Sequence, residues 1–210
     1  MSEKFSNLMI DLETLSTRAN GTVVAVGAVF FNPATGKLGP TFDGAIDMAD
    51  AVRYGKVDGE TLKWWFGQSD AARKGMIRGR HTAEKVWSEF VKFASQFGKD
   101  VQPWGNGSSF DITMCEWQIG VVLNQKAPWQ FWNVRDVRTI KELAKGIVKF
   151  DDKLEATAHT ALDDAIFQAK YVSAFYQGLR AGPESPKAFQ NIVKAKMDAD
   201  EDDFEITLDD

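Results

Sequence analysis

The sequence is poor in the residues that form disulfides and zinc centres, with one cysteine and two histidines among 210 residues. A single cysteine, Cys115, cannot form a disulfide within the chain, which fits a reducing compartment. No apolar run approaches the roughly 20 residues that cross a bilayer. The first residues also lack the apolar centre of a signal peptide. We therefore expect a cytoplasmic protein without membrane contact, and no structural zinc centre.

The chain also lacks the basic surplus that is typical of nucleic-acid-binding proteins, since its formal net charge is -5. This charge is unevenly distributed. The last 13 residues contain eight acidic side chains and no basic one, so residues 1–197 carry a net charge of +3. We expect one domain over residues 1–182 and an extension over 183–210 that ends in a disordered acidic tail. The tail is expected to compete with nucleic acid for the protein's own basic cleft or to contact a protein partner.

Apolar and β-branched stretches predict strands at 5–10, 22–32, 101–106 and 129–134, and the turn at 32–37 predicts that 37–46 returns antiparallel. Periodic patterns predict helices over 82–97, 109–123, 136–146 and 160–179. In the second of these, Phe110, Met114, Trp117 and Val121 form the predicted apolar side. A β-meander followed by alternating helices and strands predicts an α/β fold with a mixed sheet.

Two carboxylates interrupt the first predicted strand in the segment "LMIDLETLS". Asp11 and Glu13 are two positions apart, so in a strand both side chains emerge on the same face. Adjacent like charges are costly unless a positive group lies between them. Taken alone the pair is a weak signal, because acids two apart are common. Its place at the end of a core strand is where ligands gather in α/β folds.

Two later segments place further polar groups at the starts of predicted helices. In "GNGSSFD" (105–111), glycines and serines allow a substrate backbone to come close, and Asp111 falls in the first helical turn. In "AHTALDDA" (158–165), His159 precedes a long helix. Asp163 and Asp164 flank its apolar stripe on opposite sides, so the helical wheel does not choose between them. Capping serines and dipole-compensating acids are the ordinary alternative for each segment.

Together the segments supply Asp, Glu, Asp, His and Asp, each at the edge of a core element. Four carboxylates and a base that titrates near neutrality are what a two-metal phosphodiesterase site requires. Hard oxygen ligands favour Mg²⁺ or Mn²⁺.

The order "DLE", "SSFD" and "HTALDD" resembles the DnaQ-like (DEDDh) 3′–5′ exonucleases over about residues 5–180. The stretches "LKWWFGQSDAARK" (62–74), "GNGSSFD" and "FWNVRDVRT" (131–139) resemble more specifically the phage-encoded, DexA-like exodeoxyribonucleases and similar bacterial exoribonucleases. This resemblance implies a ribonuclease-H-like fold with a five-stranded mixed sheet flanked by helices. A phage source would place the protein in the host cytoplasm. The H-x4-D spacing of that family selects Asp164 over Asp163.

The resemblance implies roles for the five candidate catalytic residues. Asp11 would contact both of two Mg²⁺ or Mn²⁺ ions, Glu13 and Asp164 would hold the ion at the attacking water, and Asp111 the second ion. His159 would take the proton of the water. The reaction would release nucleoside 5′-monophosphates from the 3′ end of DNA, with single-stranded ends the expected substrate. An exoribonuclease, a non-catalytic nucleic-acid-binding module and a metal-dependent phosphatase or nucleotidase remain the alternatives.

Further residues are candidates for substrate binding. The resemblance implies that the backbone around Thr14 and the side chain of Leu15 meet the terminal nucleotide. Adjacent tryptophans are not expected both to face inward on a helix, so one of Trp64 and Trp65 is expected at the surface, where it could stack on a base. The other candidates are Gln68, Trp104, Asn106, Ser109 and Phe110 for the nucleotide, and Arg135, Asp136, Arg138 and the basic stretch 73–81 for phosphate or for orienting His159. Buried aromatics and solvated ion pairs are the alternative interpretation of these residues. The resemblance allows a homodimer, since some similar exonucleases pair, but no interface is evident in the sequence.

Overall fold

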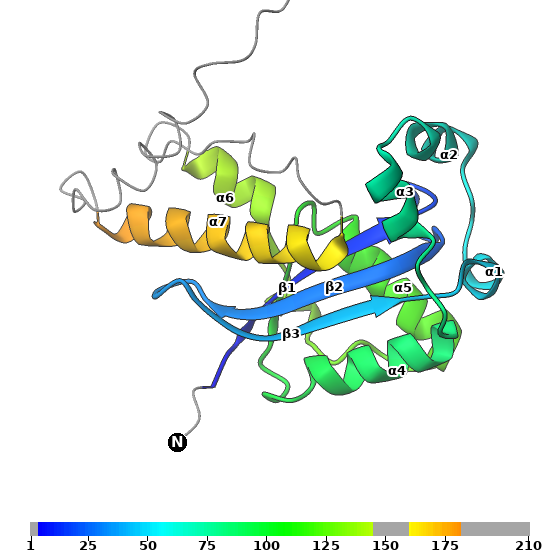
Figure 1. The fold of residues 1–210 in the computed structure, drawn as a ribbon. Helices are drawn as coiled ribbons and strands as arrows, with labels where there is room; N and C mark the ends of the chain where they lie inside the picture. The colour runs from blue at the N-terminus through cyan, green and yellow to red at the C-terminus, as the bar shows by residue number, and fades with distance from the viewer. Residues whose placement is uncertain (1–3, 145–159, 182–210) are drawn as a thin grey trace, which may run out of the picture.

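The computed structural model describes residues 4–144 and 160–181 (Figure 1). Its centre is a five-stranded mixed sheet in the order β3-β2-β1-β4-β5, which confirms the predicted fold class. The first three strands form an antiparallel meander, whereas β4 runs parallel to β1 and β5 runs parallel to β4. The strands are β1 (Asn7–Thr14), β2 (Val23–Asn32), β3 (Lys37–Ala45), β4 (Gln102–Gly105) and β5 (Arg135–Asp136).

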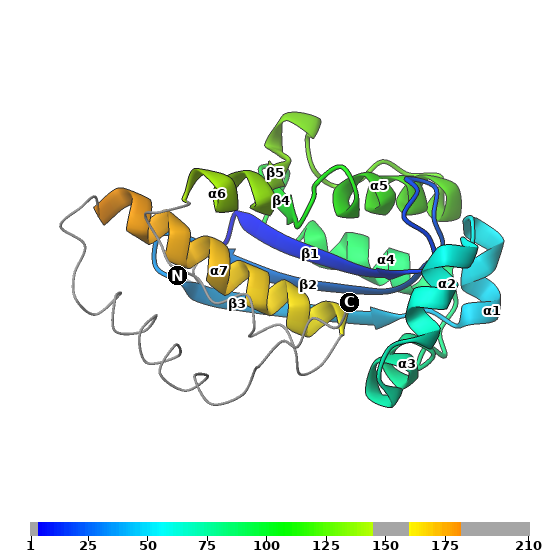
Figure 2. The ribbon, with the colours of Figure 1, turned by 90° about the horizontal axis from the view of Figure 1, so that it is seen from above.

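Helices cover both faces of this sheet, α4 and α5 on one face and α6 and α7 on the other (Figures 1 and 2). Three short helices, α1 to α3, lie beyond the ends of β1 and β3. The α-helices are α1 (Met48–Ala51), α2 (Gly59–Phe66), α3 (Asp70–Met76), α4 (Ala83–Ala94), α5 (Asp111–Leu123), α6 (Val137–Leu143) and α7 (Ala161–Ala181), with 3₁₀ turns η1 (Val52–Tyr54) and η2 (Phe131–Asn133). No helix within residues 4–144 and 160–181 is long and apolar enough to span a membrane.

The start of α7 lies directly on the central part of the sheet. A Cβ atom at Gly27 would come within 2.1 Å of the backbone of Ala161 and Leu162, so only glycine permits this approach. Gly27 pairs with Asp11 on one side and with Asp43 on the other. Directly paired residues project from the same face of a sheet. The first turn of α7 therefore lies beside the side chain of Asp11.

The structure corrects three of the predicted elements. The strand predicted at 129–134 is wrong, because this segment forms η2 and sheet pairing begins only at Arg135. The apolar side predicted for α5 is wrong in part: Met114 is buried and Phe110 packs against the core, but Trp117 and Val121 are 44% and 45% exposed while Ile112 and Ile119 are buried. This helix carries apolar residues nearly all round, so periodicity does not identify its inner face. The first strand, predicted to end at residue 10, continues through both acids to Thr14.

Candidate active site

The two faces of strand β1 differ: one packs into the apolar core, and the other, the acidic face, carries Asp11 and Glu13. Leu8, Ile10 and Leu12 belong to the cluster packed under α4 and α5, whereas Met9 belongs to the cluster under α6 and α7. Because side chains alternate along a strand, Asp11 and Glu13 follow Met9 on the α7 side. The predicted shared face of the two acids is therefore confirmed. Their face is the one covered by the first turn of α7.

Helix α7 brings a third carboxylate to this pair. Carboxylate oxygens of Asp11, Glu13 and Asp164 all lie within 4.8 Å of one another. The neighbouring Asp163 is exposed and accepts a hydrogen bond from Thr160 Oγ1 at 2.6 Å. Thr160 Oγ1 in turn accepts from the backbone N–H of Asp163 at 3.2 Å, so Asp163 helps to close the start of the helix. The structure thus places Asp164, and not Asp163, in the acidic group.

Asp111 adds a fourth carboxylate from the start of α5. It is only 3% exposed, and a Cβ atom at Gly105 would lie 2.9 Å from the Cβ atom of Asp111. Burial raises the pKa of Asp111 to about 7, against hydrogen bonds from the backbone of Asn106 and the nearby charge of Arg138, which lower it. The negative charge of Asp111 in turn acts on Asp11 and Glu13. All four predicted acids therefore share one site, with Asp111 beside the group of three.

The electrostatics of this site oppose the ionisation of its own acids. Burial raises the pKa of Asp11 well above its ordinary value, and the charges of Asp111, Glu13 and Asp164 raise it further. Burial also raises the pKa of Glu13 to about 7, with Asp164 adding to the effect and Arg78 opposing it. Carboxyls that are crowded in this way hold protons that a cation would displace.

The donor set fits a divalent cation. Every group in the cluster offers carboxylate oxygen, which hard ions such as Mg²⁺ and Mn²⁺ prefer. Glu13 Oε1 is buried and has no hydrogen-bond partner among the described residues. A buried polar atom without a partner requires an explanation, and a bound ion at this position would provide one. Asp11, Glu13, Asp111 and Asp164 are thus the residues that could hold metal.

A fifth polar residue, which the sequence did not reveal, supports this cluster. Gln168 Nε2 donates a hydrogen bond to Asp11 Oδ1 at 2.8 Å, and the side chain is only 7% exposed. Gln168 lies four residues after Asp164, so both side chains project from one face of α7. The i, i+4 spacing from the predicted ligand was the only local signal that could have identified this residue.

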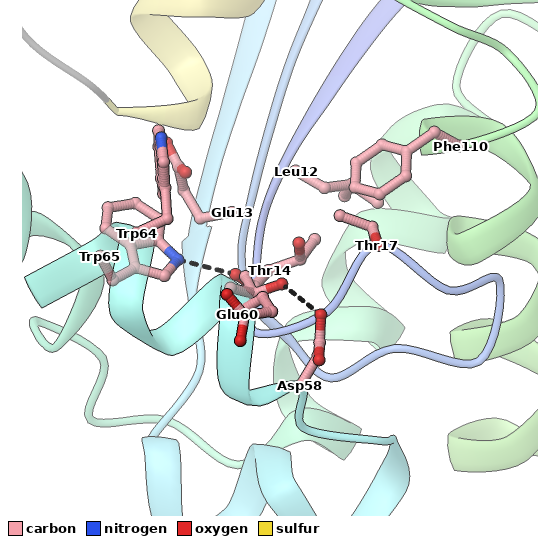
Figure 3. Close-up of a pocket in the computed structure, with 10 residues that line it drawn as sticks. Leu12, Glu13, Thr14, Thr17, Asp58, Glu60, Trp64, Trp65 and Phe110 are labelled. Carbon is pink, nitrogen blue, oxygen red and sulfur yellow. Dashed lines mark hydrogen bonds between the residues drawn. The ribbon is translucent and has the colours of Figure 1, made fainter.

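A cavity of about 510 Å³ adjoins Glu13 (Figure 3). Trp64 and Phe110 lie on opposite sides of it, with Glu13 and Leu12 between them. The lining consists of aromatic, hydroxyl and acidic side chains: Leu12, Glu13, Thr14, Thr17, Asp58, Glu60, Thr61, Trp64, Trp65 and Phe110. A space of this size is typical of small-molecule sites.

The two adjacent tryptophans of α2 have different environments, as the sequence predicted. Trp64 is 53% exposed, whereas Trp65 is 2% exposed. The indole N–H of Trp65 donates to the carbonyl oxygen of Thr14 at 2.8 Å, which fixes the backbone at the end of β1 (Figure 3). Trp65 therefore anchors the cavity wall, and Trp64 is the ring that offers a free surface.

The structure brings only some of the other predicted nucleotide contacts to the cavity. Thr14 and Phe110 line it, but Leu15 is buried in the core with 2% exposure. Gln68 lies two residues after α2, where its amide donates to the carbonyl oxygen of Trp64 at 3.1 Å. Ser109 is exposed on the loop before α5. Neither Gln68 nor Ser109 lines the cavity.

Near β5, the predicted residues Asp136 and Arg135 form hydrogen bonds to backbone groups, whereas Arg138 acts on Asp111 through its charge. Asp136 accepts a hydrogen bond from the backbone N–H of Ser108 at 2.6 Å and so holds the loop that carries Asp111. Arg135 donates to the carbonyl oxygen of Trp132 at 3.0 Å. Arg138 is exposed and lies near Gly107, where its charge lowers the pKa of Asp111. Trp104 is buried and donates to Asn7 Oδ1 at 2.9 Å, so it belongs to the core.

In the basic stretch 73–81, Lys74 and His81 are exposed, and each arginine has a hydrogen-bond or ion-pair partner. Arg73 donates to the carbonyl oxygen of Phe66 at 2.9 Å, and Arg80 donates to the carbonyl oxygen of Gly79 at 2.7 Å. Arg78 instead pairs with Asp43 on β3. The remaining predicted catalytic residue, His159, and the acidic tail lie outside the described residues.

Arg78 and Arg138 border the acidic site from opposite sides. Asp43, the partner of Arg78, is in register with Gly27 and through it with Asp11. Arg78 therefore lies on the β3 side of the acids, and its charge lowers the pKa of Glu13. Arg138 lies on the β4 side, beside Asp111. The negative cluster is thus flanked by two positive charges.

Comparisons with known proteins agree with the motifs and the fold. A model of the family described as 3′–5′ exoribonuclease Rv2179c-like domain matches residues 6–176. An exodeoxyribonuclease of Enterobacteria phage T4 is 23% identical over 217 residues, which cover 84% of this chain and 93% of that protein. The matched family range contains the four acids and His159, and the resemblance to 3′–5′ exonucleases is confirmed.

Solved structures share the fold at low sequence identity. The zinc-bound complex of E. coli exonuclease I with single-stranded DNA has a TM-score of 0.61 at 12% identity, covering 92% of this chain and 44% of that one. The nuclease domain of 3′hExo bound to rAMP, described as a DEDDh family member, has a TM-score of 0.51 at 13% identity, covering 88% and 96%. These likenesses confirm the ribonuclease-H-like architecture.

Proposed function

The chain belongs to the Rv2179c-like 3′–5′ exoribonuclease domain family, and we propose that within this activity it removes nucleoside 5′-monophosphates from the 3′ end of single-stranded DNA. The observation that carries the proposal is the position of the 510 Å³ cavity directly beside the acidic cluster, with Glu13 common to both. A terminal nucleotide whose base and sugar occupy the cavity would place its 5′-phosphate at the carboxylates.

Asp11, Glu13, Asp111 and Asp164 would hold two Mg²⁺ or Mn²⁺ ions. When bound, such ions lower the pKa of a water molecule and neutralise the charge that develops on the phosphate oxygens. The protein supplies a buried, all-oxygen donor set whose members repel one another until a cation arrives. His159, two residues before α7, is proposed to take the proton of the attacking water, because an imidazole titrates near neutrality.

The cavity favours a terminal nucleoside over an internal one. Trp64 offers a face on which a base can stack, and Phe110 closes the other side. Asp58 and Glu60 line the same cavity, and their negative charges oppose the entry of a further phosphate. The strand would therefore end in this cavity with a sugar hydroxyl, which is the requirement of an exonuclease that starts at a 3′ end.

Arg78 and Arg138 are proposed to contact phosphates of the strand that leads into the site. Both lie beside the acids without belonging to them. The exposed pair of Arg78 with Asp43 contributes little stability, so a phosphate can replace the carboxylate at low cost. The relative from phage T4, an exodeoxyribonuclease, is the main support for DNA as the polymer.

RNA is the second candidate substrate, and two observations favour it. The matching family model is described as an exoribonuclease domain, and the fold is shared with a nuclease bound to rAMP. Hydroxyl and carboxylate side chains of the cavity, such as Thr17 and Asp58, could also hydrogen-bond a 2′-OH.

The test uses the full chain with Mg²⁺ or Mn²⁺ and oligomers of DNA and RNA of the same sequence, labelled at either end, beside an Asp11→Ala control. We expect a ladder that shortens from the 3′ end, nucleoside 5′-monophosphates as products, and faster removal from DNA. An oligomer ending in a 3′-phosphate should resist. Metal-dependent shortening of neither polymer would contradict the proposal, and faster shortening of RNA would replace DNA by the second candidate.

A further inference from the structure

Gln168 joins α7 to β1 at the centre of the acidic site. Its amide nitrogen is 2.8 Å from Asp11 Oδ1, although the two residues are 157 positions apart in the sequence. Asp164 lies one helical turn before it. One face of α7 therefore supplies both a carboxylate to the cluster and a hydrogen-bond donor to the central carboxylate of that cluster.

At position 168, an apolar side chain would stabilise the folded state more than glutamine does. The side chain is buried, and the small gap beside it is lined by Asn106, Val137, Lys141, Phe167 and Tyr171. Its other amide atom, Oε1, is buried without a hydrogen-bond partner among residues 4–144 and 160–181. A buried amide with one unpaired atom opposes folding. Packing alone therefore does not account for a glutamine at this position.

The hydrogen bond to Asp11 explains why position 168 is a glutamine. Carboxylate oxygens of Glu13 and Asp164 lie within 4.8 Å of those of Asp11, so without a donor the Asp11 side chain would rotate away from them. A lysine or arginine at position 168 would hold Asp11, but its charge would compete with a metal ion. The neutral N–H of glutamine holds one oxygen of Asp11 and adds no charge.

We propose that Gln168 is a positioning residue for the metal site: its amide N–H holds Oδ1 of Asp11 and so directs this carboxylate toward Glu13 and Asp164. This inference rests on the proposed function in so far as it requires a divalent ion at the acids. Donors of this kind orient metal ligands in many proteins, and their loss costs about 10–100-fold in metal affinity or activity.

The experiment compares Gln168→Met with a matched substitution on the same helix, Gln177→Met. Gln177 is also partly buried and donates its amide N–H to the carbonyl oxygen of Pro33 at 3.4 Å, nine residues beyond Gln168. Binding of Mn²⁺ to the full chain is measured by calorimetry, and the melting temperature is measured with and without Mn²⁺. Gln168→Met should weaken Mn²⁺ binding about 10–100-fold, with little change in the metal-free melting temperature, whereas Gln177→Met should bind Mn²⁺ like the wild type.

Nuclease kinetics provide a readout that a purely structural role would not change. In Gln168→Met, kcat should fall, the KM for the oligomer should stay unchanged, and raised Mn²⁺ should restore kcat. If Gln168→Met does not fold, Gln168→Asn replaces it, since the shorter amide keeps its polarity but does not reach Asp11. Wild-type Mn²⁺ affinity in the variant that folds would overturn the inference.

The two proposals fail in distinguishable ways. A wild-type protein that binds Mn²⁺ but shortens no oligomer contradicts the proposed function, and the Mn²⁺ titration of Gln168→Met still decides the role of Gln168. A wild-type protein that shortens DNA while Gln168→Met retains full Mn²⁺ affinity contradicts only the inference about Gln168. A wild-type protein that binds no divalent ion contradicts both.

Discussion

The two faces of strand β1 show how one short segment serves both stability and chemistry. On the α4 and α5 side, Leu8, Ile10 and Leu12 are buried among apolar neighbours. On the α6 and α7 side, Met9 begins the face in the same manner, but Asp11 and Glu13 continue it. The apolar face lowers the free energy of the folded state, whereas burial and mutual repulsion of the acids raise it. Adjacent residues of one strand should therefore respond in opposite ways to substitution.

The largest effect is expected at Asp11. Asp11→Asn removes a carboxylate that both proposed metal ions would share, so nuclease activity should fall on the order of 10³-fold or more. The same change removes one of four crowded charges, so the metal-free melting temperature should rise. Steady-state kinetics and calorimetry in EDTA measure the two effects.

Ile10→Ala is the matched control for Asp11→Asn on the opposite face. Ile10 is fully buried, so the substitution should lower the free energy of unfolding by about 2–5 kcal/mol, with activity retained below the melting transition. A loss of stability in Asp11→Asn as large as that in Ile10→Ala would contradict the division between the two faces.

The acidic face should also make metal-free stability depend on pH. The pKa values of Glu13 and Asp111 are raised to about 7 in the folded protein, whereas carboxyls of an unfolded chain titrate at about 4. Between these values the folded state binds more protons than the unfolded state, so the free energy of unfolding should fall as pH rises from about 4 to 7. Thermal melts in EDTA test this decline, which saturating Mn²⁺ should abolish. Metal-free stability that rises over the same window would be inconsistent with a cluster of raised carboxyl pKa values.

A smaller effect is expected where the acidic face of β1 meets the cavity. Trp64→Ala removes an exposed stacking surface, so the KM for an oligomer should rise about 10-fold, in line with about 1–3 kcal/mol per stacked base, and the melting temperature should change little. Trp65→Ala should instead destabilise the fold by about 3–5 kcal/mol, because it leaves a cavity and frees the carbonyl of Thr14. Equal effects on KM and stability in the two variants would remove the distinction between the two rings.

The smallest effect is expected at the basic margin of the site. Arg78→Gln should reduce the slope of log affinity for single-stranded DNA against log salt concentration by about one. Arg53→Gln is the control, since Arg53 also forms an exposed ion pair, with Asp50 at 3.0 Å, but has no described interaction with the acids. The same change of slope in both variants would show that net charge alone is responsible.

Much of the site could be predicted from the sequence because its signals are local. The i, i+2 spacing fixes the shared face of Asp11 and Glu13 in any strand. The loop before Asp111 is marked by its glycines, and family spacing separates Asp164 from Asp163. The structure places all four acids in one site, as the motif order implied. Such features depend on neighbours in the sequence rather than on distant packing.

The parts that could not be predicted depend on contacts between distant segments. Gln168 matters through Asp11, 157 residues away, and its i, i+4 spacing from Asp164 is the only local signal of that role. The buried side of α5 is decided by the elements packed against it, because the helix is apolar nearly all round. The aromatic segment 129–134 has the composition of a strand, but pairing to β4 begins only at Arg135.

The central claim is that Asp11, Glu13, Asp111 and Asp164 form one divalent-cation site beside a nucleoside cavity. The most direct test is anomalous diffraction from crystals of the full chain grown with Mn²⁺ and a nucleoside 5′-monophosphate. We expect Mn²⁺ peaks bounded by these four carboxylates, with the base beside Trp64 and the phosphate next to Glu13. Mn²⁺ bound elsewhere, or no Mn²⁺ at these acids, would contradict it.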